Sequence, residues 1–343
     1  MHISELDFEL PPELVATEPL GHRDDSRLLY VDRTAGTYVD RRFSDLHRIL
    51  DRTDVLVLNN TKVFPARLLG TSDTGAAVEI FLVKEVAENT WDALARPARR
   101  LPPGRSIVFG DGFSGQIIQR DGEGHVIVSL QARGSITEAI ERFGRTPLPP
   151  YIKRERDAPD RDRQRYQTVY ASRSGAIAAP TAGLHFTPRV LEELREKGIQ
   201  MIEITLHVGY GTFEPVKVEK LNDHRVQPER YELNEDAAAK LAKARSEGRR
   251  IIAVGTTTTR TLETVIGRTG EFRASSGDAD LTILPGYEFR AIDGLLTNFH
   301  LPKSSLLALV SAFGGHKLIM NAYEYAVRSR YRFYSYGDCM LIV

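Results

Sequence analysis

An uninterrupted apolar run at residues 55–58, which ends in the polar residues 59–62, sets the strongest limit on how this chain of 343 residues can fold. A strand without polar alternation is typical of a sheet that is covered on both faces. In an open α/β sheet, the residues at the carboxyl ends of such strands line the ligand crevice. The run therefore predicts a layered α/β domain with a site at one edge of its sheet.

The alternation of strands and helices continues in the C-terminal half. Thr187, Asn234 and Ser304 stand where N-cap residues open helices, and Pro188 follows the first of them. Strands that are joined through helices favour parallel neighbours. We therefore predict a mostly parallel sheet with flanking helices. The predicted strands are residues 55–58, 199–208, 251–254, 294–297 and 334–343, with a hairpin at 28–31 and 37–41; the predicted helices are 44–50, 187–198, 234–248, 256–266, 304–314 and 316–330.

The stretch from residue 64 to residue 147 has a different pattern. Short β-type runs are separated by turns rich in Gly and Pro, and residues 121–124 are typical of a hairpin connection. Only residues 136–143 are helix-like. Such spacing predicts an antiparallel β-barrel or a sandwich. We expect residues 64–147 to be a β-barrel domain inserted into a discontinuous α/β domain of residues 1–63 and 148–343. The β-type runs are residues 77–83, 91–95, 106–109, 115–119 and 125–130.

Composition excludes several classes of protein. The 46 Lys and Arg residues balance 46 Asp and Glu residues, which argues against a highly basic, non-specific nucleic-acid coat. The single cysteine, Cys339, excludes an internal disulfide framework and a thiolate-rich metal site. The acidic N-terminal segment lacks the pattern of a signal peptide, and no apolar stretch approaches the ~20 residues of a membrane span. We expect a soluble, cytoplasmic protein.

Four polar loops follow predicted strands or precede predicted helices. Three of them carry a histidine each, His185, His207 and His300, and the fourth carries a run of threonines that begins at Thr256. Because the carboxyl ends of parallel strands meet at one edge, these loops are expected to lie together. Small residues before a helix also let backbone N–H groups approach an anion. The four loops are residues 179–187, 207–213, 255–260 and 297–302.

Other interpretations of these residues stay open. Any one of the three histidines alone is more often a structural, hydrogen-bonded side chain, and the threonines could merely open a helix. The Gly209 and Gly211 pair begins like a dinucleotide-binding loop, but Glu214 stands where the third glycine belongs. No carboxylate or second histidine stands at ligand spacing beside a histidine, so no metal site is predicted.

Long motifs are spread over the whole chain, among them residues 179–187, 255–257 and 296–303. Together they resemble the S-adenosylmethionine:tRNA ribosyltransferase-isomerase family of queuosine biosynthesis. The resemblance implies an α/β domain with an inserted β-barrel. It is strongest at residues 179–187, 255–257, 296–303 and 334–338. The other matching motifs are residues 7–11, 23–29, 58–63, 66–68, 148–152 and 166–171.

The family's reaction is implied for this chain. The ribosyl part of S-adenosylmethionine is transferred and isomerised onto 7-aminomethyl-7-deazaguanine at the wobble position of tRNA. The product is epoxyqueuosine, and adenine and methionine leave. S-adenosylmethionine is then a substrate, no separate cofactor is expected, and the partner is tRNA that carries the aminomethyl base. No membrane or protein partner is indicated.

The resemblance and the residue types together assign roles. His185, beside a helix N-terminus that disfavours its imidazolium form, is the expected base, and His207 or His300 is expected to act on the leaving adenine. The residues expected to bind substrate are Asp24, Arg27, Asn60, Thr181, Gly183, Gly209, Gly211, Thr256, Thr257, Asn298 and Asp338. The residues expected to bind tRNA are Arg96, Arg99, Arg100, Arg328 and Arg330.

Two segments depart from the family pattern. Members usually carry His-x-Met-His-Ser-Glu where this chain has residues 224–229, in which Gln227 replaces the second histidine and Pro228 precedes Glu229. The threonine run also continues through residues 258–260, where Ser-Val-Arg is more usual. Two alternatives follow. One is a related sulfonium-ribosyl transferase that acts on a free base or another amine, and the other is a non-catalytic relative that binds tRNA or S-adenosylmethionine.

Overall fold

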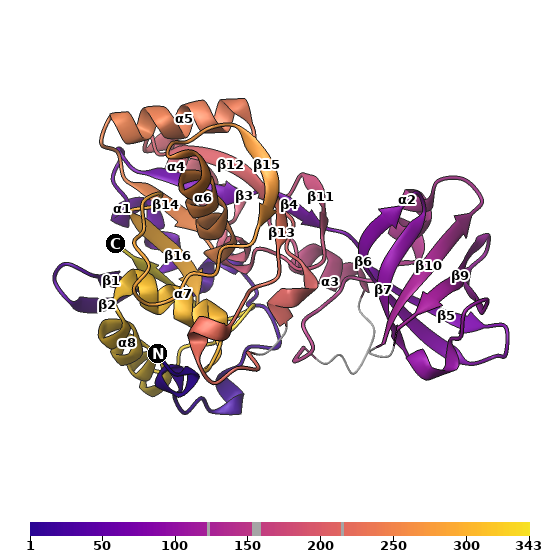
Figure 1. Ribbon diagram of the computed structural model, residues 1–343. Helices are drawn as coiled ribbons and strands as arrows, with labels where there is room; N and C mark the ends of the chain where they lie inside the picture. Colours follow the sequence, from indigo (N-terminus) through magenta and orange to yellow (C-terminus); the bar gives the residue numbers. More distant parts are fainter. Residues whose placement is uncertain (122–123, 153–158, 214–215) are drawn as a thin grey trace. The chain divides into compact units, whose positions relative to one another are not determined.

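The computed structural model describes residues 1–121, 124–152, 159–213 and 216–343 (Figure 1). They form two compact units, which we call the sheet unit and the barrel unit. The sheet unit comprises Met1–Lys62, Pro150–Lys153 and Gln167–Val343, and the barrel unit comprises Val63–Pro149 and Arg154–Tyr166. The insertion expected at residues 64–147 falls within the barrel unit, which also takes in helix α3 (Pro159–Arg165).

A nine-stranded sheet forms the centre of the sheet unit, and it is mixed rather than mostly parallel. Its order is β15-β13-β12-β3-β14-β16-β17-β1-β2. The pairs β12·β3, β3·β14, β14·β16 and β17·β1 are parallel, and the remaining neighbours are antiparallel. The strands are β1 (Arg27–Asp32), β2 (Thr37–Arg42), β3 (Val55–Asn59), β12 (Gln200–Leu206), β13 (Glu229–Leu233), β14 (Ile251–Val254), β15 (Ser275–Ala279), β16 (Gly294–Asn298) and β17 (Cys339–Ile342).

The chain connections explain this correction. A single helix between two strands returns the chain to its starting edge and gives parallel neighbours. Two consecutive helices, α7 (Ser305–Gly314) and α8 (His316–Arg328), lie between β16 and β17, so the chain re-enters the sheet from the opposite edge. The β1–β2 hairpin is antiparallel, as predicted. Strands β13 and β15, which the sequence analysis missed, extend the other side of the sheet with antiparallel pairs.

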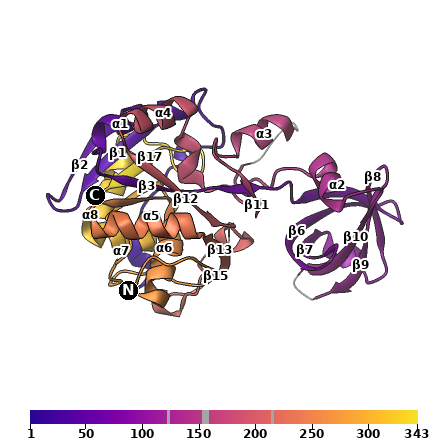
Figure 2. The ribbon, with the colours of Figure 1, turned by 90° about the horizontal axis from the view of Figure 1, so that it is seen from above.

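Helices lie on both faces of the sheet (Figure 2), and a hydrophobic core is packed on each face. Helices α5 (Glu235–Ser246), α6 (Thr256–Thr269), α7 and α8 contribute to the larger core, with Val55 and Val57 of β3. Helices α1 (Leu46–Ile49) and α4 (Pro188–Glu196) pack on the other face, against Leu56 and Leu58. Every residue of β3, β14 and β16 is buried, as the unbroken apolar run of β3 predicted.

Side-chain caps set the beginnings of three of these six helices. Thr187, Asn234 and Ser304 each accept a hydrogen bond from a backbone N–H of the first turn, so these three predicted N-caps are confirmed. Helix α4 ends before Gly198, whose φ of +86° favours glycine. The N-cap predicted at Ser44 is wrong, because a short 3₁₀ turn (Phe43–Asp45) precedes α1.

The barrel unit contains a closed barrel of six strands in the order β10-β7-β6-β5-β8-β9, and all neighbours that pair in it are antiparallel. This confirms a barrel over a sandwich; β5 was missed in the sequence. Helix α2 (Ile136–Phe143) has the predicted bounds and is capped by Ser135. The hairpin predicted at 121–124 includes residues outside the described ones. The strands are β5 (Arg67–Ser72), β6 (Ala77–Ala87), β7 (Thr90–Arg96), β8 (Ser106–Gly110), β9 (Phe113–Arg120) and β10 (His125–Ala132).

A separate two-stranded sheet joins β4 (Thr61–Val63) to β11 (Arg173–Ala176). Strand β4 begins directly after Asn60, whose carbonyl accepts the backbone N–H groups of Ser172 and Arg173. The polar segment that follows β3 is therefore held in a defined position next to the edge of the large sheet.

The N-cap of α5 allows a direct test of this fold. Replacing Asn234 with Ala removes the acceptor for the N–H of Ala237 and should lower the free energy of unfolding by about 1 kcal/mol. The Asn234→Ser variant keeps an acceptor and should stay close to the parent protein. Urea denaturation measures both, and equal destabilisation by the two variants would contradict a capping role.

Candidate functional site

The carboxyl edge of the central strands gathers polar side chains from distant parts of the chain. Asn59, the last residue of β3, donates to the carbonyl of Leu206 at 2.9 Å and accepts from its N–H at 3.0 Å. Its Nδ2 also lies 3.4 Å from Oγ1 of Thr257 in the first turn of α6. One buried amide thus links the ends of β3 and β12 to the N-terminus of α6. This agrees with the expectation that the polar loops lie together at one edge of the sheet.

His185 is buried at this edge, in the 3₁₀ turn Thr181–His185. Its Nδ1 lies 2.8 Å from Ser26 Oγ, and its Nε2 lies 3.2 Å from Asn298 Nδ2 at the end of β16. The ring packs against Phe43 with centroids 5.2 Å apart. Burial, with a smaller contribution from nearby arginines, lowers the pKa of His185 to about 3. The imidazole is therefore neutral at physiological pH.

The other two predicted histidines occupy separate environments. His300 is buried, and burial lowers its pKa to about 3; its Nε2 lies 2.9 Å from Thr297 Oγ1. His207 is half-buried, with Nδ1 2.8 Å from Thr61 Oγ1, and burial lowers its pKa as well. Thr297 and Asn298 are successive residues of β16, so their side chains point to opposite faces. Within the described residues, no hydrogen bond joins any two of the three rings.

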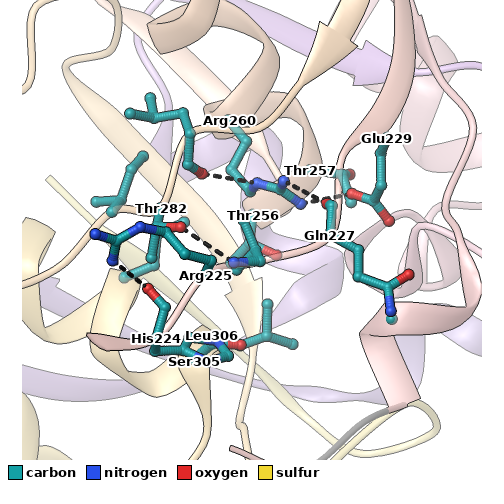
Figure 3. A pocket seen from close by; sticks show the side chains of 15 residues that line it. His224, Arg225, Gln227, Glu229, Thr256, Thr257, Arg260, Thr282, Ser305 and Leu306 are labelled. Carbon is teal, nitrogen blue, oxygen red and sulfur yellow. Dashed lines mark hydrogen bonds and ion pairs between the residues drawn. The ribbon is translucent and has the colours of Figure 1, made fainter. Parts of the chain in front are cut away.

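A cavity of about 80 Å³ lies beside the N-terminus of α6 (Figure 3). Its polar wall includes Thr256 and Thr257 of α6 and Gln227, and its apolar wall includes Leu306 and Leu309 of α7. The segment that departs from the family pattern supplies one side of it. The remaining lining residues are Gly211, His224, Arg225, Val226, Glu229, Arg260, Leu281, Thr282, Ile283 and Ser305.

A buried ion pair forms part of the cavity lining. Arg260 Nη1 donates to Glu229 Oε2 at 2.6 Å, and the guanidinium also donates to the carbonyls of Gln227 and Ala279. Glu229 Oε1 accepts the N–H of Gly209 at 2.8 Å. Burial raises the pKa of Glu229, while Arg260 opposes the shift. Both members of the ion pair make further hydrogen bonds to the backbone, and the pair fixes the 224–229 segment against α6.

Several of the predicted substrate-binding residues make ion pairs or hydrogen bonds with other residues of the protein. Asp24 is buried and accepts from Arg189 at 2.5 Å. Asp338 accepts the backbone N–H groups of Arg27 and Arg332, both at 2.8 Å, and burial raises its pKa. The Arg27 guanidinium stacks on Tyr331, 3.6 Å from the ring centroid. These contacts tie the start of β1 to the start of β17.

Some of the remaining predicted substrate-binding residues are packed inside the protein, and others line the cavity. Asn60 accepts from Thr205 Oγ1 at 2.8 Å and donates to Glu203. Gly183 has no room for a side chain, because a Cβ would collide with the Tyr170 hydroxyl. Thr181 opens the 3₁₀ turn and is partly exposed. Gly209 is bonded to Glu229, whereas Gly211, Thr256 and Thr257 line the cavity.

The five arginines expected to contact tRNA are all exposed. Arg96, Arg99 and Arg100 belong to the barrel unit, at the end of β7 and in the turn after it. Arg328 and Arg330 belong to the sheet unit, at the end of α8, where they face Glu324 and Glu13 at 3.8 and 4.0 Å. Both units therefore present cationic side chains to solvent.

Comparison with known proteins assigns the chain to a family. The family described as queuosine biosynthesis protein matches residues 3–342. S-adenosylmethionine:tRNA ribosyltransferase-isomerase of Trichlorobacter lovleyi is 48% identical, with the whole of both chains covered. The chain belongs to the queuosine biosynthesis protein family. The enzyme of the same name from Moorella thermoacetica is 51% identical, again over both full lengths.

A solved structure of a family member agrees with this assignment. The crystal structure of S-adenosylmethionine tRNA ribosyltransferase from Thermotoga maritima is 38% identical and covers 99% of this chain and 100% of its own, with a TM-score of 0.58. The family and the enzyme class that the motifs predicted are thus confirmed. Across the described part of the chain, no helix has the length and apolar character needed to cross a membrane.

Sequence reasoning missed several residues at the site of this queuosine biosynthesis protein. Ser26, which contacts the His185 ring, lay inside a quoted motif but was not singled out. Arg260 and Glu229 were noted only as parts of the segments that depart from the family pattern. Those departures were the available signal, since residues 224–229 form a cavity wall. Leu306 and Leu309 carry no sequence signal, because apolar helix residues usually belong to a core.

The buried histidines predict how stability depends on pH. An unfolded histidine takes up a proton near pH 6.5, whereas native His185 and His300 stay neutral down to about pH 3. The unfolded chain therefore binds more protons between these values, and the free energy of unfolding should fall as pH is lowered, by up to about 1.4 kcal/mol per pH unit for each ring. Urea denaturation of the parent and of His185→Gln between about pH 6.5 and 5 measures this. Equal slopes in the two proteins would contradict it.

Proposed function

We propose that this enzyme transfers and isomerises the ribosyl group of S-adenosylmethionine onto 7-aminomethyl-7-deazaguanine at the wobble position of tRNA. The product is epoxyqueuosine-tRNA, with adenine and methionine released. The observation that carries the proposal is the match over the full chain to relatives whose names state S-adenosylmethionine, tRNA, ribosyl transfer and isomerisation. S-adenosylmethionine is a substrate here rather than a resident cofactor, since its ribose carbons enter the product.

The chemistry requires a base at the ribose. The sulfonium acidifies the C5′ hydrogens, so the first step is loss of a C5′ proton to a neutral side chain. Burial keeps His185 neutral at physiological pH, and its ring lies among residues of three motifs, with contacts to Ser26 and Asn298. We assign the base to His185. The same desolvation keeps His300 neutral, so His300 would have to gain a proton before it could act as an acid toward adenine.

The cavity beside α6 is the proposed binding site for part of S-adenosylmethionine. Free N–H groups at a helix N-terminus attract an anionic group such as the methionine carboxylate. Thr256 and Thr257 add hydroxyls at that position, and Leu306 and Leu309 offer apolar contact to the aliphatic chain. The positive N-terminus of α6 thus matches the methionine carboxylate, and the apolar wall matches the aliphatic chain of the same methionine.

The exposed arginines are the proposed contacts to tRNA. Arg96, Arg99 and Arg100 on the barrel unit and Arg328 and Arg330 on the sheet unit would pair with phosphates. A substrate of this kind locates the enzyme in the cytoplasm. Binding through phosphate contacts weakens steeply as salt is raised.

A second candidate is a related transferase that acts on a free base or another amine. The observation that favours it is the altered segment 224–229, where Gln227 and Pro228 stand in place of the usual His and Ser and Gln227 lines the cavity. Such an enzyme would release adenine from S-adenosylmethionine with the small acceptor and show little dependence on salt. A non-catalytic relative would bind S-adenosylmethionine without releasing adenine.

The deciding assay incubates the protein with S-adenosylmethionine and tRNA that carries the aminomethyl base. Free adenine and the modified nucleoside should form in equal amounts, and both are measured by chromatography with mass detection. His185→Gln should lower kcat by about 10²- to 10⁴-fold while the protein stays folded, because a positioned base contributes a factor of this size. A folded His185→Gln variant with full turnover would remove His185 from the mechanism.

The cavity assignment predicts a separate effect on substrate affinity. Thr257→Val removes one hydroxyl from the cavity and should raise the KM for S-adenosylmethionine about two- to tenfold, with a smaller change in kcat. Thr269→Val changes a threonine of the last turn of the same helix and is the matched control. Identical KM values for the two variants would place the ligand elsewhere.

A further inference from the structure

A chain of hydrogen bonds determines which nitrogen of His185 carries its hydrogen. Ser26 Oγ donates its only hydrogen to the carbonyl of Arg23 at 3.1 Å. The same oxygen lies 2.8 Å from His185 Nδ1, so it must accept a hydrogen there. Nδ1 is therefore the protonated nitrogen of the neutral ring.

The other side of the ring gives the same answer independently. Asn298 Nδ2 donates to the carbonyl of Tyr334 at 3.1 Å, and a carbonyl can only accept, so the orientation of the amide is set. The second hydrogen of this NH₂ group faces His185 Nε2 at 3.2 Å, which makes Nε2 an acceptor. Tyr334 has a φ of +76°, a strained conformation of the kind that clusters at functional sites.

We propose that Ser26 and Asn298 are positioning residues that hold His185 as a neutral imidazole with its hydrogen on Nδ1. The inference rests on the proposed function, in which Nε2 of His185 receives the C5′ proton. It adds the two residues that prepare the ring for that step. Ser26 comes from the segment before β1 and Asn298 from the end of β16, so the ring is held between two distant parts of the chain.

Asn298 can also support the ring after it has taken up the proton. Its Oδ1 is buried and has no hydrogen-bond partner among the described residues. When the C5′ proton moves to Nε2, the electron pair stays on the carbon beside the sulfonium. A turn of the amide, which gives up the Nδ2 bond to the Tyr334 carbonyl, then brings Oδ1 to Nε2–H, where it accepts a hydrogen bond from the imidazolium.

The charged groups around the ring make this acceptor necessary. Arg23 and Arg332 face His185, and both lower its pKa. The turn Arg23–Asp25, which directly precedes Ser26, carries Asp24, which is already paired with Arg189, and Asp25, which is exposed to solvent. No carboxylate contacts the ring within the described residues. An amide oxygen is therefore the group placed to stabilise the imidazolium.

Nuclear magnetic resonance of the ligand-free, full-length protein tests the proposal without any turnover. In protein labelled with ¹⁵N at histidine, the ring of His185 should show a hydrogen on Nδ1 and none on Nε2 between about pH 5 and 8. Asn298→Asp places an ionised acceptor at Nε2, so the ring should become protonated within this range. Ser26→Ala removes the acceptor for Nδ1–H, and a mixture of the two neutral forms should appear.

Thr297→Val is the matched spectroscopic control, because Thr297 contacts His300 in the same segment and not His185. It should change the His300 ring signals and leave those of His185 unaltered. In Asn298→Asp, the acid limb of the kcat/KM profile should also move upward into the same pH range, which loss of packing alone would not produce.

A hydrogen on Nε2 of His185 in the parent protein would overturn the proposal, and so would unchanged His185 signals in both Ser26→Ala and Asn298→Asp. If the signals behave as expected but His185→Gln keeps full turnover, the positioning of the ring stands and the assignment of the base fails. The two inferences can therefore be separated in one set of variants.

Discussion

Burial of the central strands on both faces is the constraint on which the rest of the sheet unit depends. Because β3, β14 and β16 expose no side chain, helices must cover both faces, and polar groups are confined to the strand ends. The carboxyl edge then becomes the place where Asn59, Asn298 and the first turn of α6 meet. These buried polar side chains are therefore gathered at one edge of the sheet, and it is there that we propose the chemistry takes place.

Desolvation gives those polar residues their chemical state. A histidine at the surface would be partly protonated near neutral pH, but His185 and His300 lose the solvent that would stabilise an imidazolium. A neutral ring is ready to accept a proton but is a weak base. The hydrogen bonds of Ser26 and Asn298 then decide which ring nitrogen carries the hydrogen. Packing thus keeps the ring neutral, and these hydrogen bonds leave Nε2 as the nitrogen that can accept a proton.

Short-range sequence signals predicted many elements of the fold. The three N-caps, the β1–β2 hairpin and the bounds of α2 follow from short-range rules, and the structure confirms them. The direction of β17 and the edge strands β13 and β15 were not predicted. The direction of β17 depends on the path of the chain through α7 and α8, and the edge strands depend on pairing between segments far apart in the sequence. No local sequence pattern predicts either of them.

The amino-acid pattern alone was sufficient for the family, for a sheet covered on both faces and for the barrel, because each rests on short motifs or on periodic burial. Tertiary structure decided the rest. It directed the side chains of Thr297 and Asn298 to opposite faces of one strand, so His185 and His300 were not brought into contact, and it enclosed a cavity between α6, α7 and residues 224–229. The physical reason is that a side chain's neighbours, and hence its desolvation and its proton, are set by segments far away in the sequence.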